Sequence, residues 1–210
     1  MKFSNTIELE ISGERALFRD PTSSESLPVP SYESLKGILG SIYWNPVFTW
    51  VPDNLRVMEH ISWHGEGMRI STFSESTNSK RVQNASVQYL RSVKYQLRAH
   101  FIWNEQRPDL EHDRDENKHF RIALRSLSRG GRRAIYLGSA DCPGTVRSIH
   151  FGSGAGDYDN TGSTDLGSLF HSFDHAAGIP LYSDLSMDNG LIDLSPVNTR
   201  QKGRPSCRSF

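Results

Sequence analysis

SVKYQLRAHFIW, residues 92–103, carries the clearest β-strand pattern in the chain. Apolar or aromatic side chains occupy every second position of it: Val93, Tyr95, Leu97, Ala99, Phe101 and Trp103. The positions between them are mostly polar, so one face of the strand can pack on a core while the other faces outward. This stretch therefore predicts a long, half-buried β-strand.

Upstream of this strand, the pattern predicts one more long strand and a helix. Residues 5–19 alternate in polarity with a break at Gly13, which favours a strand with a bulge or turn. A helix is expected between Ser31, a good N-cap residue, and Pro46, which cannot continue a helix. The other upstream predictions are strands over 47–51 and 55–63 and a loop-rich segment over 65–84.

Downstream of it, Asp113 or Asp115 can cap a helix over about 116–129, and Gly130 is a suitable stop. A short strand is expected over 135–138, and a hairpin is expected to turn at Asn189-Gly190. This element order predicts an α+β fold of ferredoxin-like type. The predicted division is a ferredoxin-like domain over 1–144, a small antiparallel β domain over 145–198, and a disordered basic tail over 199–210.

Charge is balanced overall but segregated locally. The 210 residues include 24 cationic and 24 acidic side chains, so net charge alone does not indicate a nucleic-acid binder. However, 18 of the 24 cations are arginine, whose planar fork pairs with phosphates. Six acids lie within 105–116, and none lies between 117 and 133. Such segregation can create a basic face on a neutral protein.

Other sequence features point to a cytoplasmic protein. No apolar run is long enough to span a bilayer, and the N-terminus lacks the apolar core and cleavage site of a signal peptide. Cys142 and Cys207 lie in unrelated contexts, so they are expected to be free thiols. No membrane partner is therefore expected.

The arginines gather on one face of the helix predicted over 116–129. Arg121, Arg125 and Arg129 recur every four residues and project away from the apolar stripe, and Arg132 and Arg133 extend the series. Like charges at this spacing repel each other, and a simply solvated face would usually interleave glutamate. A solvated face stays an alternative, but the pattern favours a surface that binds a polyanion.

Lys118 and His119 lie near the N-terminus of the same helix, and this end of a helix attracts phosphate. A histidine beside a lysine can support RNA cleavage by attack of the 2′-hydroxyl without a metal. The helical angle places His119 at the border between core and solvent. The dipeptide alone is a weak signal, and Tyr43 on the first helix fits a core aromatic equally well.

Metal and cofactor motifs are weak. His171 and His175 have the spacing of a zinc pair but lie in a strand-like segment, where their side chains would not converge. DYDNTGSTD, from Asp157, resembles the start of a calcium loop but has Ser168 where the loop needs glutamate. GSGAGD lacks the third glycine of a dinucleotide fingerprint. We therefore expect no metal and no cofactor.

Several stretches taken together carry a resemblance to a known family. They are VPSYESLKGILGSIYWNP (29–46), LRVMEHI (55–61), VKYQLRAHFIWNEQRPDLEHDRDENKHF (93–120), RSLSRGGRRAIYLG (125–138) and FGSGAGDYD (151–159). In order and spacing they resemble the CRISPR-associated Cas-five proteins of the type I-C system. These proteins belong to the RAMP superfamily, so the resemblance implies a domain of RNA-recognition-motif type followed by a small β domain.

The resemblance also implies an activity and a set of residues. Type I-C members are metal-independent endoribonucleases that cut the repeat hairpin of precursor CRISPR RNA and stay on its 5′ handle in the interference complex. Their catalytic Tyr-Lys-His set would correspond to Tyr43, Lys118 and His119. Expected partners are CRISPR repeat RNA and the other subunits of the complex. A non-catalytic subunit that caps the RNA is the alternative, and duplex DNA is a further candidate partner of the arginine face.

Overall fold

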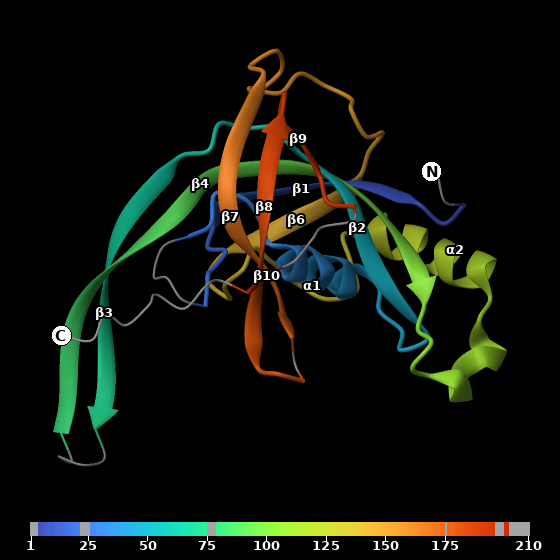
Figure 1. The fold of residues 1–210 in the computed structure, drawn as a ribbon, viewed down its shortest axis with the longest axis horizontal. Helices are drawn as coiled ribbons and strands as arrows, with labels where there is room; N and C mark the ends of the chain where they lie inside the picture. The colour runs from blue at the N-terminus through green and yellow to red at the C-terminus, as the bar shows by residue number, and fades with distance from the viewer. Residues whose placement is uncertain (1–3, 22–25, 75–78, 175, 196–199, 202–210) are drawn as a thin grey trace.

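The computed structural model describes residues 4–21, 26–74, 79–174, 176–195 and 200–201, with only the backbone described for 68–74, 79–86 and 200–201. The fold is α+β, with antiparallel strands and few helices (Figure 1). The helical elements are α1 (Tyr32–Ile42), the 3₁₀-helix η1 (Pro108–Asp113) and α2 (Glu116–Leu127). The strands are β1 (Ile7–Ala16), β2 (Phe48–Val57), β3 (Trp63–Ser74), β4 (Ser79–Trp103), β5 (Ile135–Tyr136), β6 (Pro143–Ser148), β7 (Ser163–Asp174), β8 (Ile179–Asp188), β9 (Leu191–Asp193) and β10 (Arg200–Gln201).

Among the described residues the strands join in one sheet, in the order β10-β8-β9-β2-β4-β1-β6-β5, with β3 on β4 and β7 on β8. Strand β4 pairs with β3 through its first half and with β1 and β2 through its second half. Its second half contains residues 92–103, so the predicted strand is confirmed. The alternate residues Tyr95, Leu97 and Ala99 are buried and form part of the core.

Two predictions about the upstream strands are wrong. The segment 65–84 is mostly strand, because β3 and the start of β4 form a long hairpin that projects from the rest of the sheet (Figure 1). Backbone hydrogen bonds define this arm, and its polar sequence lacks the alternation that would reveal a strand. The strands expected over 47–51 and 55–63 are joined in one strand, β2, whose register shifts between Pro52 and Asn54 and which ends at Val57, before the predicted end.

Helix α1 begins as predicted, since the Ser31 side chain accepts a hydrogen bond from the Ser34 amide. Its apolar face packs on the core through Leu35, Ile38, Leu39 and Ile42. The helix ends at Ile42, where Tyr43 adopts an extended backbone and its amide bonds the Leu39 carbonyl. The chain then turns into β2, so Tyr43 lies at a junction between helix and sheet.

Helix α2 is capped by the Asp115 side chain, which accepts a hydrogen bond from the Lys118 amide. It ends at Leu127, two residues before the predicted end, and Gly130 follows it with a positive φ of 81°. The short strand predicted over 135–138 is present only as β5. Figure 1 shows that α2 lies near the end of α1 and of β2.

The C-terminal strands continue the same sheet. A turn at Asn189-Gly190, both with positive φ, joins β8 to β9 as predicted, and β9 pairs with β2. The division between residues 144 and 145, and the ferredoxin-like topology, stay predictions. The predicted disordered tail is partly wrong because Arg200–Gln201 form β10 against β8. Cys207 and the rest of the tail lie outside the described residues, and Cys142 is a buried free thiol.

Within the part of the chain that the structure describes, no helix is both long and apolar enough to cross a bilayer.

Candidate active site

The structure brings the Tyr43 hydroxyl and the His119 ring into direct contact. The hydroxyl oxygen lies 2.6 Å from Nδ1 of His119, although the two residues are 76 positions apart in sequence. Tyr43 follows the last turn of α1, where the Trp50 indole donates a 2.7 Å hydrogen bond to its carbonyl. His119 belongs to the first turn of α2. The ends of two helices therefore place these two side chains together.

The hydrogen-bond partner of the second ring nitrogen shows which nitrogen of His119 carries a proton. Its Nε2 lies 2.9 Å from the backbone carbonyl oxygen of Asp113. A carbonyl oxygen can only accept a hydrogen bond, so Nε2 carries a proton. In the neutral imidazole Nδ1 is then an acceptor, and the Tyr43 hydroxyl donates to it. The arrangement prepares His119 to take a proton from Tyr43.

Both members of this pair are shielded from solvent. His119 is 0% exposed and Tyr43 is 3% exposed. Phe48 of β2 lies edge-on to the His119 ring at 5.5 Å, and Trp103 at the end of β4 lies 6.1 Å from it. The predicted border position of His119 is therefore wrong. A helical angle shows which side a residue faces, but it cannot show that aromatic side chains from two strands cover that border.

Lys118 lies beside the pair but on the surface. Its side chain is 49% exposed, and its ammonium group bonds the carboxylate of Asp113. That hydrogen bond lowers the pKa of Asp113 and raises the pKa of Lys118. The same carboxylate lies 3.5 Å from Nε2 of His119. Asp113, the last residue of η1, thus contacts both predicted catalytic residues of α2.

The sequence pattern does not reveal two contributors to the site. It predicts Asp113 only as a possible helix cap. The group of Asp113 that accepts a hydrogen bond from His119 is a backbone carbonyl, which no side-chain pattern can indicate. Arg132 was predicted only as an RNA ligand, but its guanidinium group lies over the Tyr43 ring, 4.5 Å from the centroid. Burial raises the pKa of Tyr43, and the nearby Arg132 opposes that shift. The hydroxyl is therefore protonated at neutral pH and acts as a hydrogen-bond donor.

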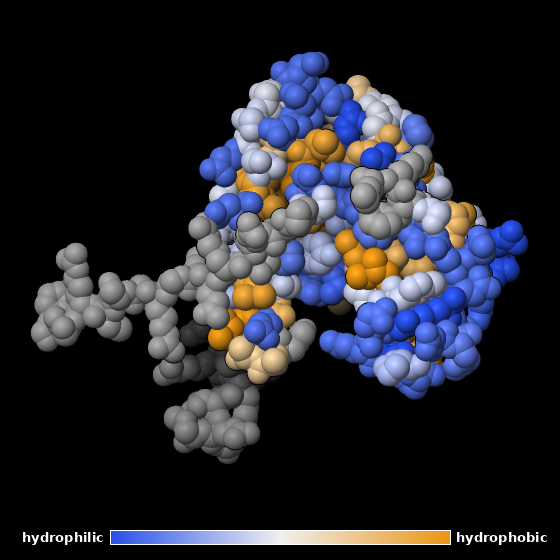
Figure 2. Space-filling model, turned by 45° about the vertical axis from the view of Figure 1, so that its right-hand side comes forward, coloured by the Kyte–Doolittle hydropathy of each residue, from blue (hydrophilic) through white to orange (hydrophobic). Residues whose placement is uncertain are grey.

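The predicted arginine face is exposed and runs along α2 into the turn that follows the helix. Ion pairs of the described residues engage other arginines: Arg15, Arg56, Arg98, Arg107, Arg114 and Arg147. By contrast, the face consists of exposed arginines without such a pair: Arg121, Arg125, Arg129, Arg132 and Arg133. Figure 2 shows mostly hydrophilic residues over the part of the molecule that carries η1 and α2. Surface charge thus remains available for a ligand.

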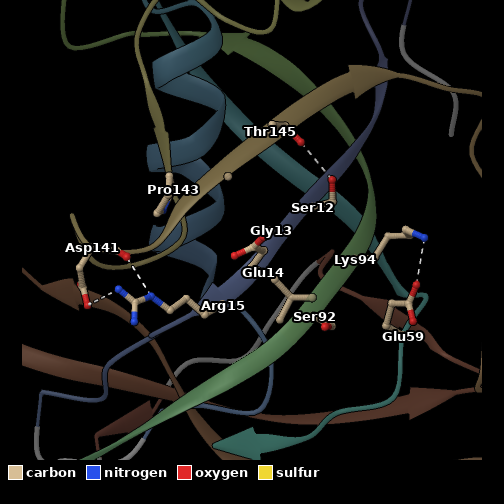
Figure 3. Close-up of a pocket in the computed structure, with 12 residues that line it drawn as sticks. Ser12, Gly13, Glu14, Arg15, Glu59, Ser92, Lys94, Asp141, Pro143 and Thr145 are labelled. Atoms are coloured by element: carbon tan, nitrogen blue, oxygen red, sulfur yellow. Dashed lines mark hydrogen bonds and ion pairs between the residues drawn. The ribbon is translucent and has the colours of Figure 1, made fainter. Parts of the chain in front are cut away.

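A cavity of about 870 Å³ lies elsewhere, between β1, β4 and β6. Its cations are engaged by acids, since Arg15 pairs with Asp141 and Lys94 pairs with Glu59 (Figure 3). None of the residues that line it belongs to the Tyr43–His119 pair. The lining holds three acids, Glu14, Glu59 and Asp141, against these two cations, so it does not attract a polyanion and is not the candidate site.

The weak metal motifs have other roles in the described residues. Asp159, in the calcium-like stretch, forms a 2.7 Å ion pair with Arg56. His171 stacks on Tyr32 with ring centroids 4.5 Å apart, whereas His175 lies outside the described residues. Among the described residues, no group of three or more histidine, cysteine or acidic side chains could hold a metal ion.

The fold and the site together describe an α+β protein with a hydrogen-bonded Tyr–His pair beside an exposed lysine and a basic helix face. The family model described as CRISPR-associated protein (Cas_Cas5), named Cas_Cas5d, matches residues 6–207. The chain belongs to this family, which confirms the resemblance in its sequence.

Similar proteins agree with this assignment. The CRISPR pre-crRNA endoribonuclease Cas5d of Mannheimia succiniciproducens is 24% identical over 96% of this chain and 100% of its own length. The crystal structure of a functionally uncharacterized protein, SMU1763c from Streptococcus mutans, shares 36% identity and a TM-score of 0.79, covering 91% of this chain and 92% of that one. A crystal structure titled CRISPR-associated Protein shares 33% identity and the same TM-score, covering 92% and 96%.

Proposed function

We propose that this protein is a metal-independent endoribonuclease that cleaves the repeat hairpin of precursor CRISPR RNA. It then stays on the 5′ handle with the other subunits of a type I-C interference complex. The observation that carries the proposal is the 2.6 Å contact between Tyr43 and His119, with Lys118 held beside it by Asp113. Family membership and the name of the curated relative support an RNA-processing role.

In the proposed reaction, the 2′-oxygen attacks the adjacent phosphorus and the bond from phosphorus to the 5′-oxygen breaks. The Tyr43 oxygen accepts the 2′-proton while its own proton passes to Nδ1 of His119. The imidazolium that forms is stabilised by the Asp113 carboxylate, 3.5 Å from Nε2. Lys118 stabilises the negative charge on the phosphorane, and the 5′-oxygen gains a proton from solvent. The products carry a 2′,3′-cyclic phosphate and a 5′-hydroxyl.

RNA must uncover the Tyr43 hydroxyl before this can happen, because the hydroxyl is buried. Two cations near it are positioned to respond to phosphate. Arg132 lies over the Tyr43 ring, and Lys118, itself exposed, is held by the partly buried carboxylate of Asp113. A phosphate that pairs with either cation would draw it from its present partner, and catalytic hydrogen bonds often become fully formed only when substrate is bound.

The direct test uses two versions of one repeat hairpin, all-ribose and 2′-deoxy at the cut site, each incubated with excess EDTA. The all-ribose RNA should be cut and the deoxy version should remain intact, because the attacking hydroxyl is missing. Product ends can be read by mass spectrometry. Cleavage that requires a divalent metal, or equal cleavage of both substrates, would contradict the proposal.

The arginine face should supply much of the salt dependence of RNA binding. Changing Arg121, Arg125 and Arg129 to glutamine should reduce the slope of log K against log salt by about 2–3, since each phosphate contact contributes about 0.7–0.9. Arg107→Gln is the matched control, because Arg107 is exposed but already paired with Asp109. An unchanged slope in the triple variant would refute the RNA role of this face.

The second candidate function is a non-catalytic subunit that caps the guide RNA. It is favoured by the burial of His119 and by the engagement of both its ring nitrogens within the protein. Such a subunit would bind both hairpins described above and cut neither. The same arginine face could also bind duplex DNA through its phosphates, which a competition between duplex DNA and repeat RNA would measure.

A further inference from the structure

A groove of about 480 Å³ lies beside the Tyr43–His119 pair but does not include it. One face of α1, from Glu33 to Ser41, forms its floor, and Trp44 lies just after the end of the helix. The first residues of β2 form one wall, and Arg133 borders the groove on another side. The groove thus lies at the junction between helix and sheet that positions Tyr43.

Trp44 is the most exposed large apolar side chain of the described residues, with 60% of its surface accessible. Its indole makes no ring contact among them, whereas Trp50 packs on Phe101 at 5.6 Å and Trp103 packs on the same ring at 5.7 Å. An exposed indole in a groove offers a flat surface on which a nucleobase can stack. The position of Trp44 is therefore better suited to a ligand than to the core.

Positive charge lies at the same groove. The backbone amide of Arg133 donates a 3.0 Å hydrogen bond to the Ser41 carbonyl, which fixes Arg133 at the C-terminal end of α1. Its guanidinium group has no ion pair with a described carboxylate. Lys36 lies on the floor, where Glu33 engages it at 3.2 Å. The groove thus combines an aromatic surface with one cation that is not engaged by an acid, which are the two groups that bind a nucleotide.

The groove is also close to the candidate active site. Phe48 lines the groove, and its ring lies 5.5 Å from both the Tyr43 ring and the His119 ring. Trp50, which also lines it, donates its indole hydrogen bond to the Tyr43 carbonyl. A strand of RNA in the groove would therefore pass within one side chain of Tyr43.

Two glycines widen the floor. Gly37 and Gly40 lie within α1, and a Cβ atom added to either one would meet nothing within 4 Å. Glycine in a helix interior is less favourable than alanine by about 1 kcal/mol, and packing within the protein does not require it here. A ligand that approaches the backbone of α1 supplies a reason for both residues.

The geometry points to a binding site for one unpaired nucleotide of the RNA next to the scissile phosphate, whose base stacks on Trp44 and whose phosphate pairs with Arg133. This inference rests on the proposed function in taking RNA as the ligand and the Tyr43–His119 pair as the place of cleavage. It adds a base-stacking subsite outside the residues that perform the chemistry.

The first test is tryptophan fluorescence with a ten-nucleotide single-stranded RNA of adenosine. The RNA should quench the tryptophan fluorescence of the wild-type protein and of Trp63→Phe. It should not quench the fluorescence of Trp44→Phe. Trp63 is the matched control because it is 49% exposed and lies at the start of β3, outside the groove. Quenching that survives in Trp44→Phe, or an absence of binding by the wild type, would overturn the inference.

The second test separates the subsite from the chemistry. It measures binding to a repeat hairpin that is 2′-deoxy at the cut site, with or without single-stranded flanks. Trp44→Ala should weaken binding of the flanked hairpin by about 5- to 100-fold, the usual effect of losing one stacked base. Binding of the trimmed hairpin should change less than about twofold. Equal losses for both hairpins would contradict a single-stranded subsite, and a loss of binding to a partner subunit instead would indicate a protein ligand.

Substitution of the two glycines tests the same subsite by changes that should stabilise the folded protein while they weaken RNA binding. The double variant Gly37→Ala, Gly40→Ala should raise Tm by several degrees, roughly 2–4 °C for each residue, while it weakens binding of the flanked hairpin. A more stable protein with unchanged affinity would place the RNA away from α1 and overturn the inference. Cleavage of the all-ribose flanked hairpin by the wild type reports on the proposed activity separately from these binding and stability measurements.

Discussion

Changing His119 to alanine should reduce the rate of repeat-RNA cleavage by about 10²–10⁴-fold, the usual contribution of a general acid–base residue. The expected reason is specific to the geometry. His119 is the acceptor of the Tyr43 hydrogen bond, and its loss leaves no described group to take the Tyr43 proton. RNA affinity should change little, because the imidazole is buried and the exposed arginines are intact. Single-turnover cleavage and equilibrium binding measure the two effects separately.

A fully buried residue also contributes to packing, so the alanine variant needs a companion. In His119→Asn, the side-chain amide oxygen can still accept the Tyr43 hydrogen bond, but it cannot take up a proton near neutral pH. This variant should fold like the wild type and still fail to cut. Recovery of near-normal cleavage in His119→Asn would show that His119 only positions Tyr43, and the proposed proton transfer would then be wrong.

Local patterns in the sequence predicted the elements that carry a hydrophobic period or a cap. Residues 92–103 alternate because one face of β4 covers the core, and Ser31 and Asp115 cap helices through contacts three residues away. The sequence did not predict the β3–β4 arm because backbone pairing between two polar strands, and not a hydrophobic pattern, forms it. The extension of the sheet by β9 and β10 depends on pairing between segments distant in the chain, which no local pattern records.

The candidate site shows the same division. The exposure of the arginine face follows from helical geometry, since Arg121 and Arg125 lie opposite the buried Ala123 and Leu127. The contact of Tyr43 with His119 could not follow from either segment alone, and it was suggested by the family resemblance. The aromatic cover of His119 and the carbonyl of Asp113 arise from tertiary packing. Local sequence therefore predicted the exposed arginine face better than the contact between Tyr43 and His119.

Asp113 connects these two parts of the site. Its carbonyl fixes the proton on Nε2 of His119, and its carboxylate holds Lys118 at the surface. The exposure of the side chains rises from His119, which is buried, through Asp113, which is 27% exposed, to Lys118, which is 49% exposed. A phosphate that approaches Lys118 would meet the edge of the buried, hydrogen-bonded Tyr43–His119 pair. This arrangement explains how a basic surface and a shielded histidine can belong to one site.

Changing Tyr43 to phenylalanine should reduce cleavage by about 10²-fold or more, because the ring remains but the hydroxyl that links RNA to His119 is lost. Tyr89→Phe is the matched control. The Tyr89 hydroxyl is also hydrogen-bonded, at 2.7 Å from the Asp141 carboxylate, and its pKa is also raised, to about 12, but it lies outside the site. Normal cleavage by Tyr43→Phe, or an equal loss in Tyr89→Phe, would exclude Tyr43 from the reaction.

The difference in stability between the wild type and Tyr43→Phe should change with pH. Burial raises the pKa of Tyr43 in the folded protein, so the neutral hydroxyl is favoured there more than in the unfolded chain. Its contribution to the free energy of unfolding is therefore complete below the ordinary tyrosine pKa and decreases as pH rises through the higher folded value. The Tm advantage of the wild type over Tyr43→Phe should be constant between pH 7 and 9 and decrease above about pH 10. An advantage that grows with alkaline pH would mean that the folded protein favours the phenolate, and Tyr43 would then be a stronger base than the structure indicates.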